Sequence, residues 1–357
     1  MTGEIWVLGA TGRVGREAVE RLRQAGAEVV VAGRDRERLA RVSPDARAVT
    51  GTLDEVCARL ATEAPSVVIN TVGPFAVTAP RVVRACPPGT HYVDVGDELS
   101  AFELLHGMDR EAAASGRTLV SGAGFGVLAT EGILLHLLAD EEKPSRVRVD
   151  AIASVAIEPG ALGEALAATI VHSLLDGGRE VRQGRLVRAR AGGDAERVTT
   201  PEGDVVTTAS LGSGELFAAW HASGAPSVIG ASALAPANPV VRAALPAIGG
   251  VLRLPGLAGF ATRRLATVTT TTAKERPRRS SWGRAQVEWP SGRVLEGWLR
   301  TGEAMTFTVG AVTEVALRLA RGEGRPGAFT PARLFGPEVA LAAGAEFLVG
   351  AAGHDIR

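Results

Sequence analysis

Short apolar runs alternate with amphipathic stretches through the first 121 residues. The apolar runs predict six strands, at Ile5–Leu8, Val29–Ala32, Ala46–Thr50, Val67–Thr71, Tyr92–Val95 and Thr118–Ser121. Helical spacing between them predicts helices at Val14–Gln24, Asp35–Val42, Leu53–Thr62, Pro80–Ala85 and Ala101–Ser115. Strands that are apolar throughout and alternate with helices indicate a parallel sheet covered on both faces. The expected fold class is therefore α/β, with a Rossmann-type doubly wound sheet.

The pattern changes after Gly126. Helices are expected at Leu128–Ala139, Ala161–Leu175, Thr313–Ala320 and Pro337–Ala345, and strands at Arg146–Ile157, Leu265–Thr272, Ala285–Trp289 and Val294–Arg300, with a hairpin over Arg179–Arg190. These elements predict a second, α+β domain on a mostly antiparallel sheet. We expect residues 1–126 plus about 306–357 to form a dinucleotide-binding domain, and residues 127–305 to form a substrate domain.

The segment "VLGATGRVG" (Val7–Gly15) joins the first strand to the first helix. Gly9 permits a tight turn, Gly12 lets the backbone approach a pyrophosphate, and Gly15 brings the helix close to the strand. The helix N-terminus then offers N–H groups to the phosphates. We expect the cofactor to be bound by Gly9, Thr11, Gly12, Arg13, Val14 and Gly15. The alternative is an ordinary strand-to-helix turn.

The end of the second strand bears on the choice of cofactor. The segment "VVVAGRDRERL" places Arg34 where binders of NAD usually carry an acidic residue. An arginine pairs well with a 2′-phosphate, so NADP is favoured over NAD. Asp35 is the competing observation, but we expect it to cap the next helix.

The fourth strand ends in "VVINTVGPF" (Val67–Phe75). Ligands bind at the carboxyl ends of strands in open α/β sheets, so Asn70, Thr71, Val72 and Gly73 are expected beside the cofactor. An ordinary strand-to-helix turn is again the alternative.

With these segments the chain resembles the saccharopine dehydrogenase-like reductases, which include trans-acting enoyl reductases of lipid and polyketide pathways. The likeness rests on "GATGRVG", "VVVAGRDRERL", "VVINTVGPF", "GTHYVDVGDE", "AATIVHSLLDGG" and "GAFTPARLFGPE", which span most of the chain. The resemblance implies an NADP-dependent oxidoreductase.

The chain departs from this family's pattern at two places. Gly51 stands where the family often has an aspartate near the adenine, which leaves Asp54 or the backbone for that contact. The segment "GFGVLATEG" replaces polar or rigid positions with Gly126, Val127 and Ala129, and Glu131 stands where the family has its final acid.

Composition narrows the class of partner. The 357 residues carry no formal net charge and only 4% aromatic residues, which disfavours nucleic acid. The two cysteines, Cys57 and Cys86, have no metal-ligand spacing, so we expect no metal and a reduced, cytoplasmic compartment. The most apolar stretch, Val240–Phe260, is interrupted by two arginines and two prolines, so no membrane span is expected.

Candidate catalytic groups are few. Tyr92 is the only tyrosine and has no lysine four residues later, which argues against short-chain dehydrogenase chemistry. Asp97 and Glu98 follow the fifth strand on the ligand side of the sheet and could pass a proton, or they could cap the next helix. His172, on a helix of the second domain, is the third candidate, with a structural role as the alternative.

These observations predict an NADPH-dependent reductase of a C=N bond, imine or iminium, in a small apolar substrate. Reduction of a C=C bond by an enoyl reductase, and a nucleotide-binding regulator without turnover, are the alternatives. Basic residues gather around "AKERPRRSSWGR", namely Arg264, Lys274, Arg276, Arg278, Arg279 and Arg284. They suggest docking of a carrier protein or CoA that brings the acceptor, or else a solvated loop. A homodimer is left open.

Overall fold

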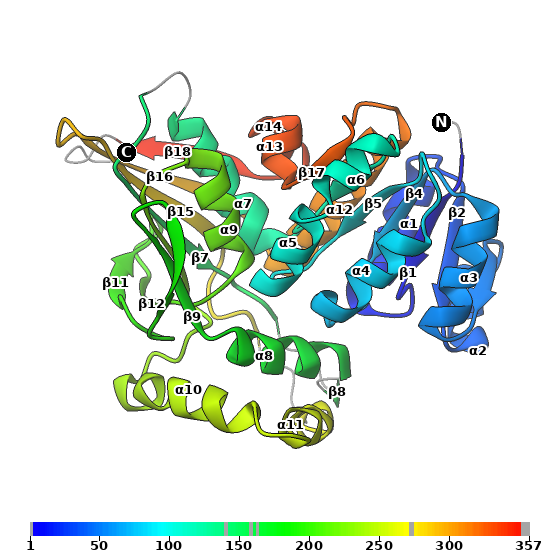
Figure 1. The fold of residues 1–357 in the computed structure, drawn as a ribbon, viewed down its shortest axis with the longest axis horizontal. Coiled ribbons are helices and arrows are strands. Elements are labelled where there is room, and N and C mark those ends of the chain that lie inside the picture. The colour runs from blue at the N-terminus through cyan, green and yellow to red at the C-terminus, as the bar shows by residue number, and fades with distance from the viewer. Residues whose placement is uncertain (1–2, 139–141, 157–159, 162–163, 271–274, 351–357) are drawn as a thin grey trace.

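The computed structural model describes residues 3–138, 142–156, 160–161, 164–270 and 275–350. Its first sheet is parallel throughout, with the order β17-β6-β5-β4-β1-β2-β3 (Figure 1). The strands are β1 (Ile5–Leu8), β2 (Val29–Gly33), β3 (Arg47–Thr50), β4 (Val67–Asn70), β5 (His91–Asp94), β6 (Thr118–Val120) and β17 (Gly327–Phe329). The six predicted strands and the doubly wound α/β class are confirmed.

Helices cover both faces of this sheet because successive strand residues point to opposite sides. On one face Val7, Val31 and Ile69 pack against α1 (Arg13–Gln24) and α12 (Ala304–Ala320). On the other face Trp6 and Val68 pack toward the remaining helices. These are α3 (Leu53–Glu63), α4 (Phe75–Ala85), α5 (Leu99–His106) and α6 (Asp109–Ala114), while α2 (Arg36–Val42) lies beside β2 and β3.

The second sheet has the order β10-β9-β13-β7-β15-β16-β18, and β12 joins it beside β13 and pairs with β11. Its strands are β7 (Arg146–Ile152), β9 (Gly178–Arg182), β10 (Arg185–Ala189), β11 (Glu196–Thr199), β12 (Val205–Ser210), β13 (Ser227–Ser232), β15 (Ser281–Glu288), β16 (Val294–Thr301) and β18 (Glu346–Gly350). Only β13 and β7 pair in parallel, so the expected mostly antiparallel sheet is confirmed. Helices α7 (Phe125–Leu138) and α9 (Gly214–Ser223) pack on one face.

Three helices form an outer layer at one edge of the molecule, namely α8 (Glu164–Asp176), α10 (Pro239–Leu252) and α11 (Leu257–Ala266) (Figure 1). A short pair, β8 (Gly160–Ala161) and β14 (Thr269–Thr270), lies beside them. The predicted strand Leu265–Thr272 is wrong at its start, because Leu257, Ala261 and Leu265 recur every four residues as the half-buried side of α11. Its last two residues lie outside the described part of the chain.

No helix in the described ranges is both long and apolar enough to cross a bilayer by itself. Helices α10 and α11 reach that length and hydropathy only jointly, and the chain bends by 119° between them.

The C-terminal segment contributes to both sheets. Helix α12 and β17 lie on the first sheet, whereas β18 pairs with β16 of the second, in contrast to the expected assignment of residues 306–357 to the first domain. Two short helices, α13 (Pro331–Phe335) and α14 (Glu338–Ala342), connect them. Strand β18 is held there by Phe347, whose ring stacks on His136 of α7 at 4.4 Å.

Candidate functional site

The carboxyl ends of β1, β4, β5 and β6 lie next to one another at one edge of the first sheet. The loops that leave them carry the cofactor-binding and catalytic candidates from the first domain, except Arg34, which follows β2. Because this is the edge at which open parallel sheets bind ligands, the loops define the candidate site.

The glycine loop has the shape that a phosphate needs. Gly9 has a φ of +78°, and a Cβ there would lie 2.6 Å from Oγ1 of Thr71. At Gly15 a Cβ would lie 2.4 Å from the carbonyl oxygen of Gly9. Gly12 caps α1 and is exposed, and a Cβ there would meet only that same carbonyl oxygen, at 3.3 Å. The outer side of the loop is therefore open, and the first turn of α1 carries no acid that would repel a phosphate.

Gly12→Val should abolish most cofactor binding and leave the fold intact. The backbone at Gly12 is extended, with φ −77° and ψ 170°, so valine can adopt it. Its branched side chain would stand where a pyrophosphate approaches the N–H groups of α1. We expect the affinity for NADPH to fall by roughly 10-fold or more, the effect of losing one charge-assisted hydrogen bond. Fluorescence titration measures it, and unchanged affinity in the folded variant would remove the loop from the site.

Arg34 follows β2 with an exposed side chain. Asp35 caps α2 as expected, since its Oδ1 accepts the amide of Arg38 at 3.0 Å. The Arg38 guanidinium in turn donates to the carbonyl oxygen of Thr11, 3.3 Å away in the glycine loop. The end of β2 therefore presents two arginines beside the loop, and the neighbouring acid is engaged in capping.

Arg34→Ala should weaken NADPH much more than NADH, because only NADPH carries the 2′-phosphate. A charge-assisted contact of this kind is worth roughly 10- to 150-fold in affinity. The measurement is the ratio of the two dissociation constants in the wild type and the variant. Equal losses for both cofactors would show that Arg34 does not contact the phosphate.

A buried polar network fixes the loops after β4, β5 and β6. The Asn70 amide donates to the hydroxyl groups of Thr78 and Tyr92, and its Oδ1 accepts the amide of Val72. The Tyr92 hydroxyl donates to Asp94, whose other oxygen accepts two backbone amides of the neighbouring loops. Burial raises the pKa of Asp94 to about 6. Because Asn70 is fully buried, it positions Val72 rather than facing a ligand; Thr71, Val72 and Gly73 are half-buried.

Asp97 follows β5 and meets a partner from the second domain. Its Oδ1 accepts the amide of Gly214 at 3.1 Å, and its carboxyl group hydrogen-bonds that of Glu215 in the first turn of α9. The residue as a whole is exposed, whereas protein surrounds its carboxyl group and removes water from it. This desolvation, and then the charge of Glu215, raise the pKa of Asp97 well above its ordinary value.

Glu215 is the member of this pair that sequence reasoning missed. It is buried, and its Oε2 has no hydrogen-bond partner within the described part of the chain. Two carboxyl groups can hydrogen-bond only when one of them keeps a proton. Gly126, which departs from the family pattern, leaves the room, since a Cβ there would lie 2.1 Å from Oε1 of Glu215. The pair therefore retains one proton at the place where the loop after β5 meets the start of α9.

The other two catalytic candidates have different surroundings. Glu98 is fully buried and accepts the amide of Ala76 at 2.8 Å, so it holds the start of α4 and offers no exposed face to an acceptor. His172 is half-buried on α8, one turn before Asp176. Asp176 accepts the hydroxyl of Ser100, so α8 lies close to the loop that carries Asp97.

Arg13 points from the glycine loop toward the second domain. Its guanidinium contacts Oε1 of Glu303 at 3.3 Å and the carbonyl oxygen of Ala156 at 3.5 Å. Both partners line a cavity of about 550 Å³, together with Glu275, Arg276, Arg278 and Arg279. Arg284 and Arg264 do not belong to this basic loop, because Arg284 is buried in β15 and Arg264 lies on α11.

Glu131 lies inside the molecule, away from the strand ends. Its carboxyl group accepts the amide of Ala332 at 2.9 Å and hydrogen-bonds the hydroxyl of Thr330. Burial raises its pKa to about 7. It therefore ties α7 to the C-terminal "GAFTPARLFGPE" segment.

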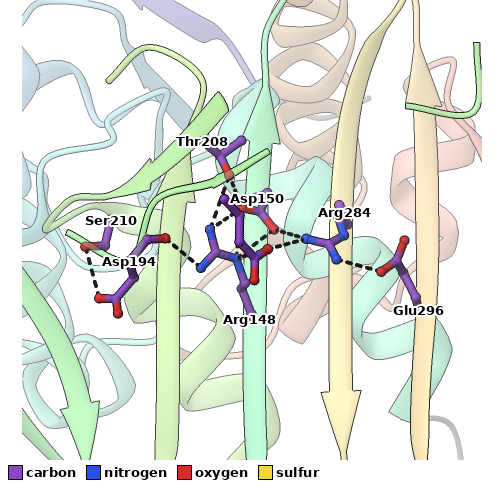
Figure 2. Close-up of polar contacts among 8 residues, drawn as sticks. Arg148, Asp150, Asp194, Thr208, Ser210, Arg284 and Glu296 are labelled. Carbon is purple, nitrogen blue, oxygen red and sulfur yellow. Dashed lines mark hydrogen bonds and ion pairs between the residues drawn. The ribbon is translucent and has the colours of Figure 1, made fainter. Parts of the chain in front are cut away.

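A second group of charged side chains is buried on the face of the second sheet opposite α7. Asp150 of β7 accepts Arg148 at 2.9 Å and Arg284 at 3.0 Å, and the hydroxyl of Thr208 at 2.7 Å (Figure 2). Arg284 also contacts Glu296 at 2.6 Å. The group joins neighbouring strands, so we assign it to the framework.

Comparison with known proteins finds a family model that matches the first domain. Residues 5–120 match the family model described as the saccharopine dehydrogenase NADP binding domain. None of the curated protein sequences matches the chain. The solved apo structure of saccharopine dehydrogenase (L-Glu forming) from Saccharomyces cerevisiae aligns with 97% of this chain and 100% of its own, at 13% identity and a TM-score of 0.58. That likeness is one of the whole fold.

Shorter likenesses reach two other solved structures. The alignment with a putative short-chain oxidoreductase from Thermus thermophilus spans 33% of this chain and 77% of that protein, with 21% identity and a TM-score of 0.29. The alignment with a short-chain dehydrogenase from Streptomyces avermitilis spans 34% of this chain and 65% of that protein, with 19% identity and a TM-score of 0.30.

Proposed function

We propose that this saccharopine dehydrogenase-like, NADP-dependent oxidoreductase reduces the C=N bond of an apolar imine or iminium metabolite. The premise is its first domain, which belongs to the saccharopine dehydrogenase NADP-binding family. The observation that carries the proposal is the Asp97–Glu215 carboxyl pair at the carboxyl end of β5.

The pair suits an acceptor that becomes cationic. NADPH, when bound, supplies the hydride. Asp97 holds a proton on its carboxyl group and can give it to the imine nitrogen, which makes the carbon more electrophilic. The carboxylate that remains, next to Glu215, stabilises the positive charge of an iminium ion. An uncharged C=C bond would gain nothing from this charge.

Steady-state assays of NADPH oxidation test the proposal. The acceptors are apolar cyclic imines, the corresponding α,β-unsaturated thioesters and the corresponding ketones. We expect kcat/KM to be highest for an imine. Turnover of thioesters alone would favour the enoyl reductase, and NADPH binding without turnover of any acceptor would favour the regulator.

The enoyl reductase remains the second candidate because of the arginine-lined cavity beside Glu303. Arg276, Arg278 and Arg279 offer positive charge to the phosphates of CoA or to the acidic surface of a carrier protein. An acceptor attached to such a carrier would most simply be a thioester.

Neutralising Arg276 and Arg279 to glutamine should lower kcat/KM for a CoA-bound acceptor and leave a small free acceptor unaffected. Arg278 is kept, because its guanidinium donates to the carbonyl oxygen of Ala153 at 2.5 Å. The loss should be greater at low salt, since salt screens exposed charges. The matched control neutralises Arg84 and Arg110, which are exposed on the first domain.

The kcat/KM values for the two acceptors and the affinity for NADPH distinguish three other roles of these arginines. Equal kcat/KM losses for free and CoA-bound acceptors would contradict docking. Weaker NADPH binding by fluorescence would assign the arginines to the cofactor. No change in either would make them surface residues.

A further inference from the structure

Helix α10 is an apolar helix with little cover, and the neighbouring helix α11 has even less. Arg242 is the only charged residue of α10, and the helix buries only Leu245 and Gly249. Helix α11 buries no residue. A helix that is apolar on all sides is normally enclosed by protein. The described part of the chain leaves this pair at the outer edge of the molecule, beyond α8 (Figure 1).

Most of the exposed large apolar side chains in the described part of the chain lie on these helices or close to them in sequence. Of the 14 large apolar side chains that are exposed among the described residues, eight lie between residues 234 and 268. They are Leu234, Val240, Val241, Ile248, Val251, Leu254, Phe260 and Val268. Val240, Ile248 and Val251 recur at helical spacing and share one side of α10. A patch of this kind marks an interaction surface.

The charge of the same region has one sign. Residues 216–274 contain no aspartate or glutamate, while Arg242, Arg253, Arg263, Arg264 and Lys274 are basic, in a chain whose net charge is zero. Arg263 and Arg264 are exposed in the last turn of α11. The Arg264 guanidinium lies 5.6 Å from the ring of Phe260, so cation and apolar group share one surface.

We infer that the α10–α11 face docks the protein on an anionic lipid surface. The apolar side chains enter the boundary between headgroups and acyl chains, and Arg263 and Arg264 contact lipid phosphates. Neither helix is long enough to cross a bilayer by itself and the chain bends by 119° between them, so we place both helices along the surface. A second copy of the chain fits less well, because a twofold interface joins two copies of the same patch, and this patch offers no acidic residue to its arginines.

Vesicle co-sedimentation of the full chain tests this inference. The probes are vesicles of phosphatidylcholine alone and of an equimolar mixture of phosphatidylcholine and phosphatidylglycerol. We expect binding to the anionic vesicles, weaker binding at high salt, and much weaker binding to the neutral vesicles. Equal binding to both kinds, or binding to neither, would overturn the inference.

Two double variants assign the binding to this face. Arg263→Gln with Arg264→Gln should lower partitioning roughly 25-fold, about 5-fold for each arginine. Val251→Gln with Leu254→Gln should lower it roughly 10-fold or more on either vesicle, through lost apolar burial. The matched controls are Arg84→Gln with Arg110→Gln, and Leu104→Gln with Val205→Gln, which change exposed residues of the same types elsewhere.

Light scattering tests the alternative that a second copy of the chain covers this face. If the controls lose as much binding as the face variants, the inference is wrong. It is also wrong if the wild-type chain is a dimer that Val251→Gln with Leu254→Gln converts to a monomer, because the face is then an interface between copies. Circular dichroism confirms that each variant is folded.

Discussion

Asp97→Asn lowers kcat for the imine acceptor by roughly 10²- to 10⁴-fold, the range of a lost general acid. Asparagine keeps the shape of the side chain and can still accept the amide of Gly214, so NADPH affinity and the unfolding midpoint should change little. What it removes is the proton that the raised pKa of Asp97 retains. The measurement is single-turnover reduction with saturating NADPH.

The pH dependence tests the same group in a second way. The protonated form of Asp97 is the donor, so kcat falls as pH rises through its raised pKa. Glu215→Gln removes the neighbouring negative charge, which lowers the pKa of Asp97 and moves that decline to lower pH. The asparagine variant should lack this limb of the profile.

Glu98→Gln is the matched control. The Glu98 carboxylate, next to Asp97 in the sequence, is buried and accepts a hydrogen bond from the amide of Ala76. The substitution should therefore affect stability more than kcat. A full rate with Asp97→Asn, or an equal rate loss with Glu98→Gln, would show that Asp97 is not the donor.

The first domain was accessible to sequence reasoning because its signals are local. Six of the seven strands of the first sheet were predicted from short local runs, and only β17, which comes from the C-terminal segment, was missed. The conformation of Gly9 and the close approach at Gly15 follow from the spacing of three glycines. The capping role of Asp35 needed only the residues next to it.

The Asp97–Glu215 pair was not accessible in this way. Asp97 stood out by its place after a strand, but its partner comes from the first turn of α9, in the other domain. No local pattern distinguishes Glu215 from a surface acid at a helix start. The packing of α9 beside α7 brings it there, and the absence of a side chain at Gly126 leaves the space.

The prediction that Arg284 belongs to an exposed basic loop was wrong for a related reason. In the sequence it belongs to a run of basic residues, which usually faces water. In the structure the run is divided, because β15 begins at Ser281 and turns Arg284 into the sheet beside Asp150. Burial opposes the charge of Arg284, but hydrogen bonds to Glu296 and the charge of Asp150 keep its pKa above the usual value.

Asp150→Ala should therefore cost about 3–5 kcal/mol of unfolding free energy, the usual consequence of leaving buried charges without their partner. Asp150 is fully buried and accepts both Arg148 and Arg284 (Figure 2). Glu196 and Glu296 remain as partners, but Glu196 is 45% exposed and cannot replace the central carboxylate. Urea unfolding followed by circular dichroism measures the loss.

Two further variants test whether unpaired charge causes the stability loss of Asp150→Ala. Glu37→Ala breaks an exposed ion pair with Arg41 and should leave the unfolding midpoint nearly unchanged. Replacing Arg148, Asp150 and Arg284 together with Met, Leu and Met removes all three charges, and should recover most of the stability that Asp150→Ala loses. If the triple variant is no more stable than Asp150→Ala, the loss comes from packing around β7 and not from unpaired charge.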